Sequence, residues 1–397
     1  MSVTLTALAW LLFTAVALVT SVFLLETLCG LLPLRRSCAG DDTDTPLDLV
    51  VLIPAHDEAL GLKAILARIN AVLPPGARIL VVADNCTDAT AAIARESGAT
   101  AIERTDPERR GKGYALAYGR DHLAAAPPAC VIVIDADCVP EPGALARIAR
   151  TALARNAAVQ CVNLLSAGPG RPPMVEISGF AFVVKNLVRQ TGLARIGAPA
   201  ILTGTGMGFP WPLFAQAPLA SGELAEDLTL GIDLVRTRRI PRFEPDAHVW
   251  SAPSASSATL TQRPRWENGF LAVARKHALP LLRDGLGSGH AAAIWMGLHL
   301  LTPPLALLVL LNLTLSAAFG LLAALGGTSG PLLAEALLLA LLLPAIGAAW
   351  ALHGRAQMRA STVLRIPFYV AWKIPIYLRL LSGGEKRWVR TERDPGA

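Results

Sequence analysis

Residues 130–138 read CVIVIDADC, a run of β-branched residues that ends in two carboxylates. Such a run without a polar break is typical of a strand buried on both faces, as in a parallel sheet. Because alternate residues of an extended chain share a face, Asp135 and Asp137 are expected to point the same way at the strand's carboxyl end, where open α/β sheets bind ligands. Two carboxylates there suit Mg²⁺ or Mn²⁺; the alternative is a strand that runs into an acidic turn.

The segments before this strand predict two more strands of the same sheet. Leu47–Pro54 passes into a helix that runs to Asn70, and Arg78–Ala83 forms the next strand. Strands that alternate with helices at such short spacing are typical of a doubly wound parallel sheet. The carboxyl ends of these strands are therefore expected to converge on one crevice, and the polar residues found there include Asp57, Glu58 and Asp84.

A basic motif with two glycines, RRGKG at 109–113, precedes another predicted helix. Glycines let the backbone approach a ligand closely, a helix N-terminus offers free N–H groups, and Lys112 adds positive charge. This combination suits a diphosphate, and a metal held at Asp135 and Asp137 would bridge the phosphate oxygens. A solvated basic turn is the alternative.

Three later motifs add candidate site residues. TGTGMG at 203–208 predicts a small-residue loop against which a sugar can lie. Glu226 and Asp227 stand at the rim of a predicted helix, where a carboxylate can act as a general base; a surface acidic pair is the alternative. QRPRW at 262–266 offers arginines for a leaving diphosphate and a tryptophan for the face of a sugar ring. The alternative is that the motif anchors the chain at the membrane interface.

Apolar stretches flank this central segment and account for a hydrophobic content of 53%. Residues 1–34 carry one charge, Glu26, and exceed the ~20 residues that span a bilayer, which predicts a retained anchor rather than a signal peptide. Residues 290–352 predict about two further membrane helices. Residues 361–397 predict an interfacial helix and a basic cytoplasmic tail, because Lys373 and two arginines would be unfavourable at the bilayer centre. Burial of Lys373 against another helix would permit spanning instead.

Basic residues indicate orientation and partners. Arg35 and Arg36 follow the first apolar segment, and Arg355 and Arg359 follow the segment that ends at Leu352, which places the central domain in the cytoplasm at the inner membrane. The net charge of +6 fits anionic lipid headgroups and phosphates, and nothing suggests nucleic-acid binding. The six cysteines have no paired spacing, which indicates reduced, structural thiols.

The ordered set PAHDE, ADNCTD, RGKG, DAD, TGTG, ED and QRPRW, over about residues 48–277, resembles membrane-embedded family 2 glycosyltransferases. Cellulose, chitin, hyaluronan and poly-N-acetylglucosamine synthases belong to this group. The resemblance implies a GT-A fold, an α/β domain with a mostly parallel sheet at residues 47–285, with N- and C-terminal transmembrane helices. The site residues that it implies are Asp57, Glu58 and Asp84 for base and ribose; Lys112 for the diphosphate; Asp135 and Asp137 for nucleotide and metal; Asp227 as general base with Glu226 beside it; and Gln262, Arg265 and Trp266 along the acceptor and diphosphate site.

The resemblance also implies an activity, the inverting, metal-dependent transfer of a hexose or N-acetylhexosamine. The donor would be a nucleotide-sugar, most simply a UDP-sugar, and the acceptor a saccharide in cell-surface or exopolysaccharide biosynthesis. Transfer of a single sugar to a lipid or lipid-linked acceptor is the alternative, and a catalytically silent sugar-binding scaffold is a third. The chain departs from the large polymer synthases because it lacks an FxVTxK loop after QRPRW and has few apolar segments, so export or accessory subunits are candidate partners.

Overall fold

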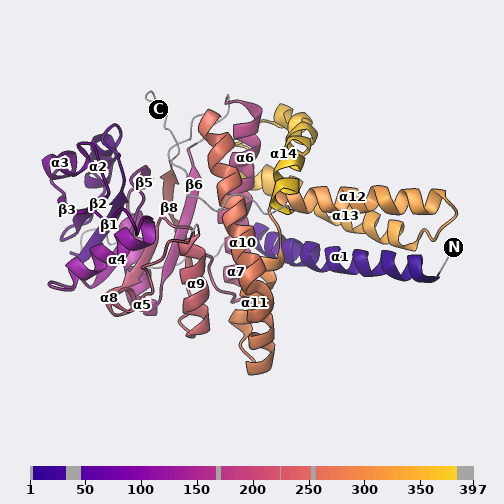
Figure 1. The fold of residues 1–397 in the computed structure, drawn as a ribbon, viewed down its shortest axis with the longest axis horizontal. Coiled ribbons are helices and arrows are strands. Elements are labelled where there is room, and N and C mark those ends of the chain that lie inside the picture. Colours follow the sequence, from indigo (N-terminus) through magenta and orange to yellow (C-terminus); the bar gives the residue numbers. More distant parts are fainter. Residues whose placement is uncertain (1–2, 33–45, 167–170, 224, 252–255, 382–397) are drawn as a thin grey trace. The chain divides into compact units, whose positions relative to one another are not determined.

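The computed structural model describes residues 3–32, 46–166, 171–223, 225–251 and 256–381 (Figure 1). Within these ranges the chain forms two compact units. We call residues 33–166 and 197–258 the sheet unit, and residues 1–32, 167–196 and 259–390 the helical unit. The division passes inside the predicted domain at 47–285, since residues 167–196 and those after 258 group with the apolar helices.

The sheet unit contains one eight-stranded sheet in the order β3-β2-β1-β4-β7-β6-β8-β5. Its first half is parallel and consists of β1 (Leu49–Ala55), β2 (Arg78–Asp84), β3 (Thr100–Arg104) and β4 (Cys130–Val133). The second half is mixed: β7 (Met207–Pro210) pairs antiparallel with β4 and with β6 (Val159–Leu165), β8 (Arg242–Ser251) is parallel to β6, and β5 (Cys138–Pro140) is antiparallel to β8. The predicted α/β fold is confirmed.

Helices cover both faces of the sheet, and β1 shows how the sequence builds the two layers. Its residues Leu49, Val51 and Ile53 enter one hydrophobic core with α2 (Leu62–Asn70) and α5 (Ala144–Arg155). Val50 and Leu52 enter the other core, which also includes α4, α8 and α9; these span Lys112–Leu123, Trp211–Ala215 and Glu226–Arg236. Because successive side chains of a strand point to opposite faces, a run without polar residues can only be buried on both.

The helical unit contains the apolar helices. Its elements are α1 (Val3–Leu31), α6 (Pro173–Val183), η1 (Val184–Arg189), α7 (Gln190–Arg195), most of α10 (Ser256–Ser288), α11 (Ala291–Leu301), α12 (Leu305–Ala324), α13 (Gly330–Ala349), η2 (Trp350–Gly354), η3 (Ala360–Arg365) and α14 (Ile366–Leu381). Among the described residues three segments are long and apolar enough to cross a membrane, Thr4–Leu31, Leu305–Ala324 and Gly330–Gly354. They lie along one another, with α13 in contact with both α1 and α12 (Figure 1).

Helix α14 is not among these three membrane-length segments, and its basic residue is buried within the protein. The amine of Lys373 bonds to the carboxylate of Glu267 on α10, and Tyr377 donates a hydrogen bond to the same carboxylate. The lysine is only 1% exposed. An interfacial position for this helix remains a prediction, and the predicted basic tail at 382–397 lies outside the described residues.

Glu26, the lone charge of the N-terminal apolar segment, is also buried and paired. Arg189 of η1 donates to its Oε2 through Nε at 2.6 Å, and Nδ1 of His299 on α11 lies 3.0 Å from Oε1. The Glu26 carboxylate has no solvent exposure, and the Arg189 side chain has 6%. These contacts join α1 to two helices that are distant in the sequence.

Replacing Arg189 with leucine is expected to lower the stability of the helical unit by about 3 kcal/mol, because it leaves the buried charge of Glu26 without its strongest partner. The double variant Glu26→Leu/Arg189→Leu removes both charges and should recover much of that loss. The measurement is the midpoint of thermal unfolding of the purified protein in detergent. A double variant whose loss equals the sum of the two single losses would show that the pair is not coupled.

Candidate active site

The two aspartates of the DAD motif lie just beyond β4. The strand ends at Val133, so Asp135 and Asp137 occupy the following turn rather than the strand itself. Their carboxylate oxygens and the Cys138 sulfur nevertheless lie within 4.8 Å of one another. Burial, and then the charge of Asp135, raise the pKa of Asp137 to about 6. Two like charges at this distance favour a divalent cation between them.

Lys112 brings a positive charge to these carboxylates. It is the first residue of α4, and its amine bonds to Asp135 and donates to the carbonyl oxygen of Gly204 at 2.5 Å. Burial acts to lower the pKa of Lys112, but the charge of Asp135 and the neighbouring carboxylates outweighs it, so the pKa is raised. The side chain is therefore a fixed ammonium ion at the carboxyl end of the sheet.

Two glycines allow the close approaches around Lys112. A Cβ at Gly113 would lie 2.4 Å from the carbonyl oxygen of Leu219, so only glycine lets α4 begin against that loop. Gly204 has φ +88°, and a Cβ there would lie 3.1 Å from the Lys112 amine nitrogen and 3.2 Å from Oδ2 of Asp227. The TGTG loop therefore passes directly beside both the lysine and the acidic pair.

The acidic pair opens helix α9. Glu226 and Asp227 are its first two residues, where the helix dipole favours negative charge. Burial, and then the charge of Asp227, raise the pKa of Glu226 to about 7. The charges of both residues act on Lys112. Glu226 and Asp227 are half-buried beside Lys112, which differs from the fully solvated surface pair that was the alternative.

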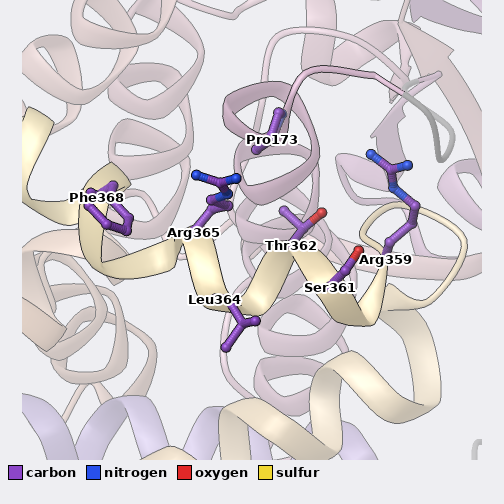
Figure 2. Close-up of a pocket in the computed structure, with 7 residues that line it drawn as sticks. All are labelled: Pro173, Arg359, Ser361, Thr362, Leu364, Arg365 and Phe368. Carbon is purple, nitrogen blue, oxygen red and sulfur yellow. The ribbon is translucent and has the colours of Figure 1, made fainter.

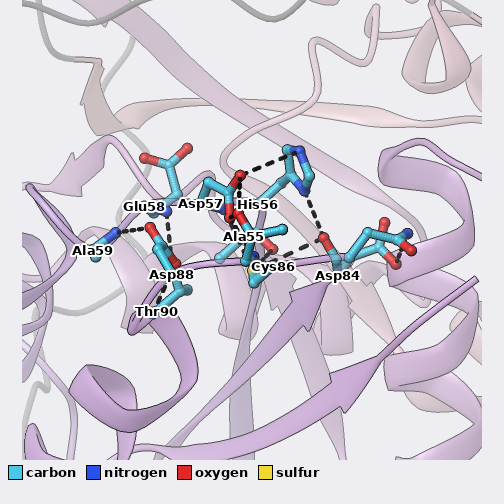
Figure 3. Close-up of polar contacts among 11 residues, drawn as sticks. Ala55, His56, Asp57, Glu58, Ala59, Asp84, Cys86, Asp88 and Thr90 are labelled. Atoms are coloured by element: carbon cyan, nitrogen blue, oxygen red, sulfur yellow. Dashed lines mark hydrogen bonds and ion pairs between the residues drawn. The ribbon is translucent and has the colours of Figure 1, made fainter. Parts of the chain in front are cut away.

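The predicted residues of β1 and β2 form a neighbouring cluster (Figure 3). Asp57 has φ +52°, and its carboxylate accepts the backbone N–H of Thr87 at 2.6 Å. His56 Nδ1 lies 2.7 Å from the carbonyl oxygen of Asp84, which joins the two strand ends. The backbone N–H of Glu58 donates to Thr90, and the Glu58 carboxylate points away from that contact (Figure 3). Asp57, Glu58 and Asp84 thus lie together, although Asp57 and Asp84 also make contacts that hold the loops after β1 and β2.

A second set of metal-type ligand atoms lies in this cluster, from Asp57, Cys86 and Asp88. Both of its carboxylates are engaged by the backbone. Asp57 accepts from Thr87, and Asp88 accepts from the N–H groups of Thr90 and Ala59 at 2.9 and 3.0 Å. A metal bound here would compete with those backbone hydrogen bonds, and Asp135 and Asp137 remain the predicted metal ligands.

Arg104, at the end of β3, is a site residue that sequence reasoning missed. Its guanidinium pairs with Asp84 at 2.6 Å and Asp106 at 2.9 Å, and lies 5.5 Å from the centre of the Tyr114 ring. Asp84 is consequently held by an internal partner and is only 6% exposed. A signal did exist in the sequence, because Asp84 and Arg104 are opposite charges at the ends of neighbouring parallel strands.

The QRPRW residues lie on α10. The side chains of Gln262 and Arg265 are outside the described part of the structure. Trp266 belongs to the helical unit, where its ring lies 5.9 Å from that of Phe182 on α6, and it is 38% exposed. Its position relative to the carboxylates of the sheet unit remains a prediction.

A mixed α/β sheet with these carboxylates beyond its fourth strand defines a GT-A-like domain. Residues 45–269, more than half of the chain, match the model of glycosyltransferase like family 2, and the chain belongs to this family. The family 2 glycosyltransferase part of the sequence-based resemblance is thereby confirmed.

Individual relatives agree with this family. Uncharacterized glycosyltransferases of Mycobacterium bovis and Mycobacterium tuberculosis are 38% identical over 100 residues, which is 25% of this chain and 41% of each relative. The match therefore spans about two fifths of their length. The mannosyltransferase PcManGT of Pyrobaculum calidifontis, solved with GDP-Man and Mn²⁺, is similar in fold, with a TM-score of 0.61 at 20% identity. That similarity covers 96% of this chain and 99% of the mannosyltransferase.

Proposed function

We propose that this protein is an inverting, metal-dependent glycosyltransferase that moves a sugar from a nucleotide-sugar to a saccharide acceptor in cell-surface or exopolysaccharide biosynthesis. The observation that carries the proposal is the convergence of Lys112 with two pairs of carboxylates, one in the turn after β4 and one at the start of α9. A cation, a metal-type acid pair and a second acid pair are the components that transfer from a nucleoside diphosphate requires.

The donor diphosphate is assigned to the end of β4. Asp135 and Asp137 supply hard oxygen ligands whose spacing fits Mg²⁺ or Mn²⁺. A metal bound there would neutralise charge on the diphosphate oxygens. Lys112 provides a second positive charge at the same place, and its raised pKa keeps it protonated at neutral pH. Charge stabilisation of this type is usually the largest electrostatic contribution in such sites.

The acceptor hydroxyl is assigned to the side of Asp227. As the hydroxyl oxygen attacks the anomeric carbon, the bond from that carbon to the phosphate oxygen breaks on the opposite face, so the anomeric configuration inverts. Asp227 takes the hydroxyl proton. Gly204 has no side chain, which lets its backbone lie close to both the Lys112 amine and the Asp227 carboxylate.

The donor base and the acceptor are finer parts of the proposal. The family resemblance favours a UDP-sugar that carries a hexose or N-acetylhexosamine. GDP-mannose is the alternative, because it is the donor in the complex of the similar mannosyltransferase. The three membrane-length helices support a protein of the inner membrane with its catalytic domain in the cytoplasm, and they equally suit single-sugar transfer to a lipid or lipid-linked acceptor.

The test is transfer by membranes that contain the protein, supplied in turn with UDP- and GDP-sugars, with Mn²⁺ or with EDTA. We expect one donor to be consumed only when a divalent metal is present, and mass analysis of the product to separate a polymer from a single added sugar. Matched membranes without the protein provide the background. If no donor is consumed under any condition, the protein is a silent sugar-binding scaffold and the proposal is wrong.

A further inference from the structure

A pocket lies in the helical unit, and none of the residues that line it is assigned to the transfer reaction. Its volume is about 550 Å³, and it is lined by η3, the start of α14 and the first residue of α6 (Figure 2). It follows the last membrane-length segment, Gly330–Gly354, within the next few residues of the chain. The pocket therefore belongs to the stretch that leaves the apolar helices.

Two arginines give this pocket its charge. Arg365 is exposed and has no hydrogen-bond or ion-pair partner among the described residues. Arg359 contacts Glu176 through Nε at 2.9 Å, while 48% of its side chain remains exposed. Figure 2 shows both guanidinium groups on the side of η3 that faces Pro173. An exposed, unpaired guanidinium beside a second one is a site that attracts an anion.

The nearby acid does not cancel this charge. Glu176 of α6 is fully buried and accepts hydrogen bonds from the hydroxyl of Thr362 and from the backbone N–H of Arg359. Together with the Arg359 side chain, these donors satisfy the carboxylate from within the protein. The contacts also fix the position of η3, so the arginines are presented from an ordered backbone. The pocket retains the charge of Arg365.

Large apolar side chains stand exposed at the edge of the same pocket. Leu364 is 78% exposed and Phe368 is 71% exposed, and both line it. A soluble anion would gain nothing from these two residues. A ligand with a charged head and a hydrocarbon chain uses both the arginines and the apolar side chains. Basic residues that follow an apolar helix lie at the level of anionic lipid headgroups.

We propose that this pocket binds a membrane lipid whose headgroup ends in a phosphate monoester. Arg365 and Arg359 hold the phosphate oxygens with charge-assisted hydrogen bonds, and the hydroxyl of Ser361 lies on the same short helix. The hydrocarbon chain lies along Leu364 and Phe368. This site does not depend on the proposed transfer reaction, because none of its lining residues is assigned to that reaction.

The experiment is lipid binding by the purified full-length protein in detergent, followed by native mass spectrometry with phosphatidic acid and phosphatidylcholine as probes. Phosphatidic acid should bind, and Arg365→Gln should weaken its binding about tenfold or more, because a charge-assisted hydrogen bond is lost. The conservative variant Arg365→Lys should retain most of the binding. Since Arg365 has no described partner, neither change should shift the midpoint of thermal unfolding.

The matched control is Arg283→Gln on α10, which removes another exposed charge, whose described partner is its sequence neighbour Asp284. This variant should bind phosphatidic acid as the wild type does. Equal binding of the two lipids, or unchanged binding by Arg365→Gln, would overturn the site. Displacement of phosphatidic acid by an equal concentration of inorganic phosphate would also overturn it, because the ligand would then be free phosphate rather than a lipid.

Discussion

Asp137→Ala is expected to lower transfer at least about 10³-fold, since it removes one of the two carboxylates that we propose as ligands of a divalent cation, and such a cation contributes several kcal/mol to transition-state stabilisation. The structure makes this a sharp test, because the carboxylate oxygens of Asp135 and Asp137 lie within 4.8 Å of each other. Raising the Mn²⁺ concentration should not restore the rate.

The fold should survive the change at this position. Burial and the charge of Asp135 raise the pKa of Asp137 to about 6, so its ionised form is unfavourable in the protein. Asp137→Asn keeps the shape and removes one of two repelling charges, and it should unfold at the same or a higher temperature than the wild type when no metal is added. Loss of activity without loss of stability would separate metal binding from a structural role.

The matched control is Asp121→Ala, which removes a 67% exposed carboxylate on α4 that pairs with the adjacent Arg120. Its activity and Mn²⁺ affinity should equal those of the wild type. Mn²⁺ affinity, measured by calorimetry, should fall in Asp137→Ala and Asp137→Asn alike. Full activity of either variant, or of the wild type in EDTA, would remove the metal from the mechanism.

Sequence reasoning placed part of the candidate site, the end of β4 and the start of α4, from local features. β-Branched runs such as Val131–Val133 are typical of buried strands, and parallel strands deliver their carboxyl ends to one edge. The RRGKG motif was likewise predicted to open a helix, and α4 begins at Lys112. These predictions needed no knowledge of which segments meet.

The missed features all depend on contacts between distant parts of the chain. Glu26 pairs with Arg189, which is 163 residues away, so the sequence showed it only as a lone charge in an apolar segment. The segment 173–195 groups with the apolar helices, although its four charged residues keep it from standing out as a membrane segment. β7 enters the sheet antiparallel to β4, which no alternation of strands and helices predicts.

Asp227→Asn is expected to lower turnover by about 10²–10⁴-fold, the usual contribution of general-base catalysis. Asparagine keeps the size of the side chain and most of its hydrogen bonding but cannot accept the proton of the acceptor hydroxyl. Affinity for the nucleotide-sugar should change little, because Lys112 keeps its bonds to Asp135 and to the Gly204 carbonyl when Asp227 is neutral.

The neighbouring acid provides the control for this prediction. The pKa of Glu226 is raised to about 7, so near neutral pH a large share of the molecules already carries it protonated, and Glu226→Gln imitates that form. Glu226→Gln should therefore lower turnover much less than Asp227→Asn. The measurement is turnover beside nucleotide affinity for both variants at one pH. If Asp227 were a structural partner of Lys112, turnover, nucleotide affinity and the unfolding midpoint would fall together. If Glu226→Gln caused the larger loss of turnover with affinity intact, the base would be Glu226, and the acceptor would approach from the first residue of α9 rather than from the second.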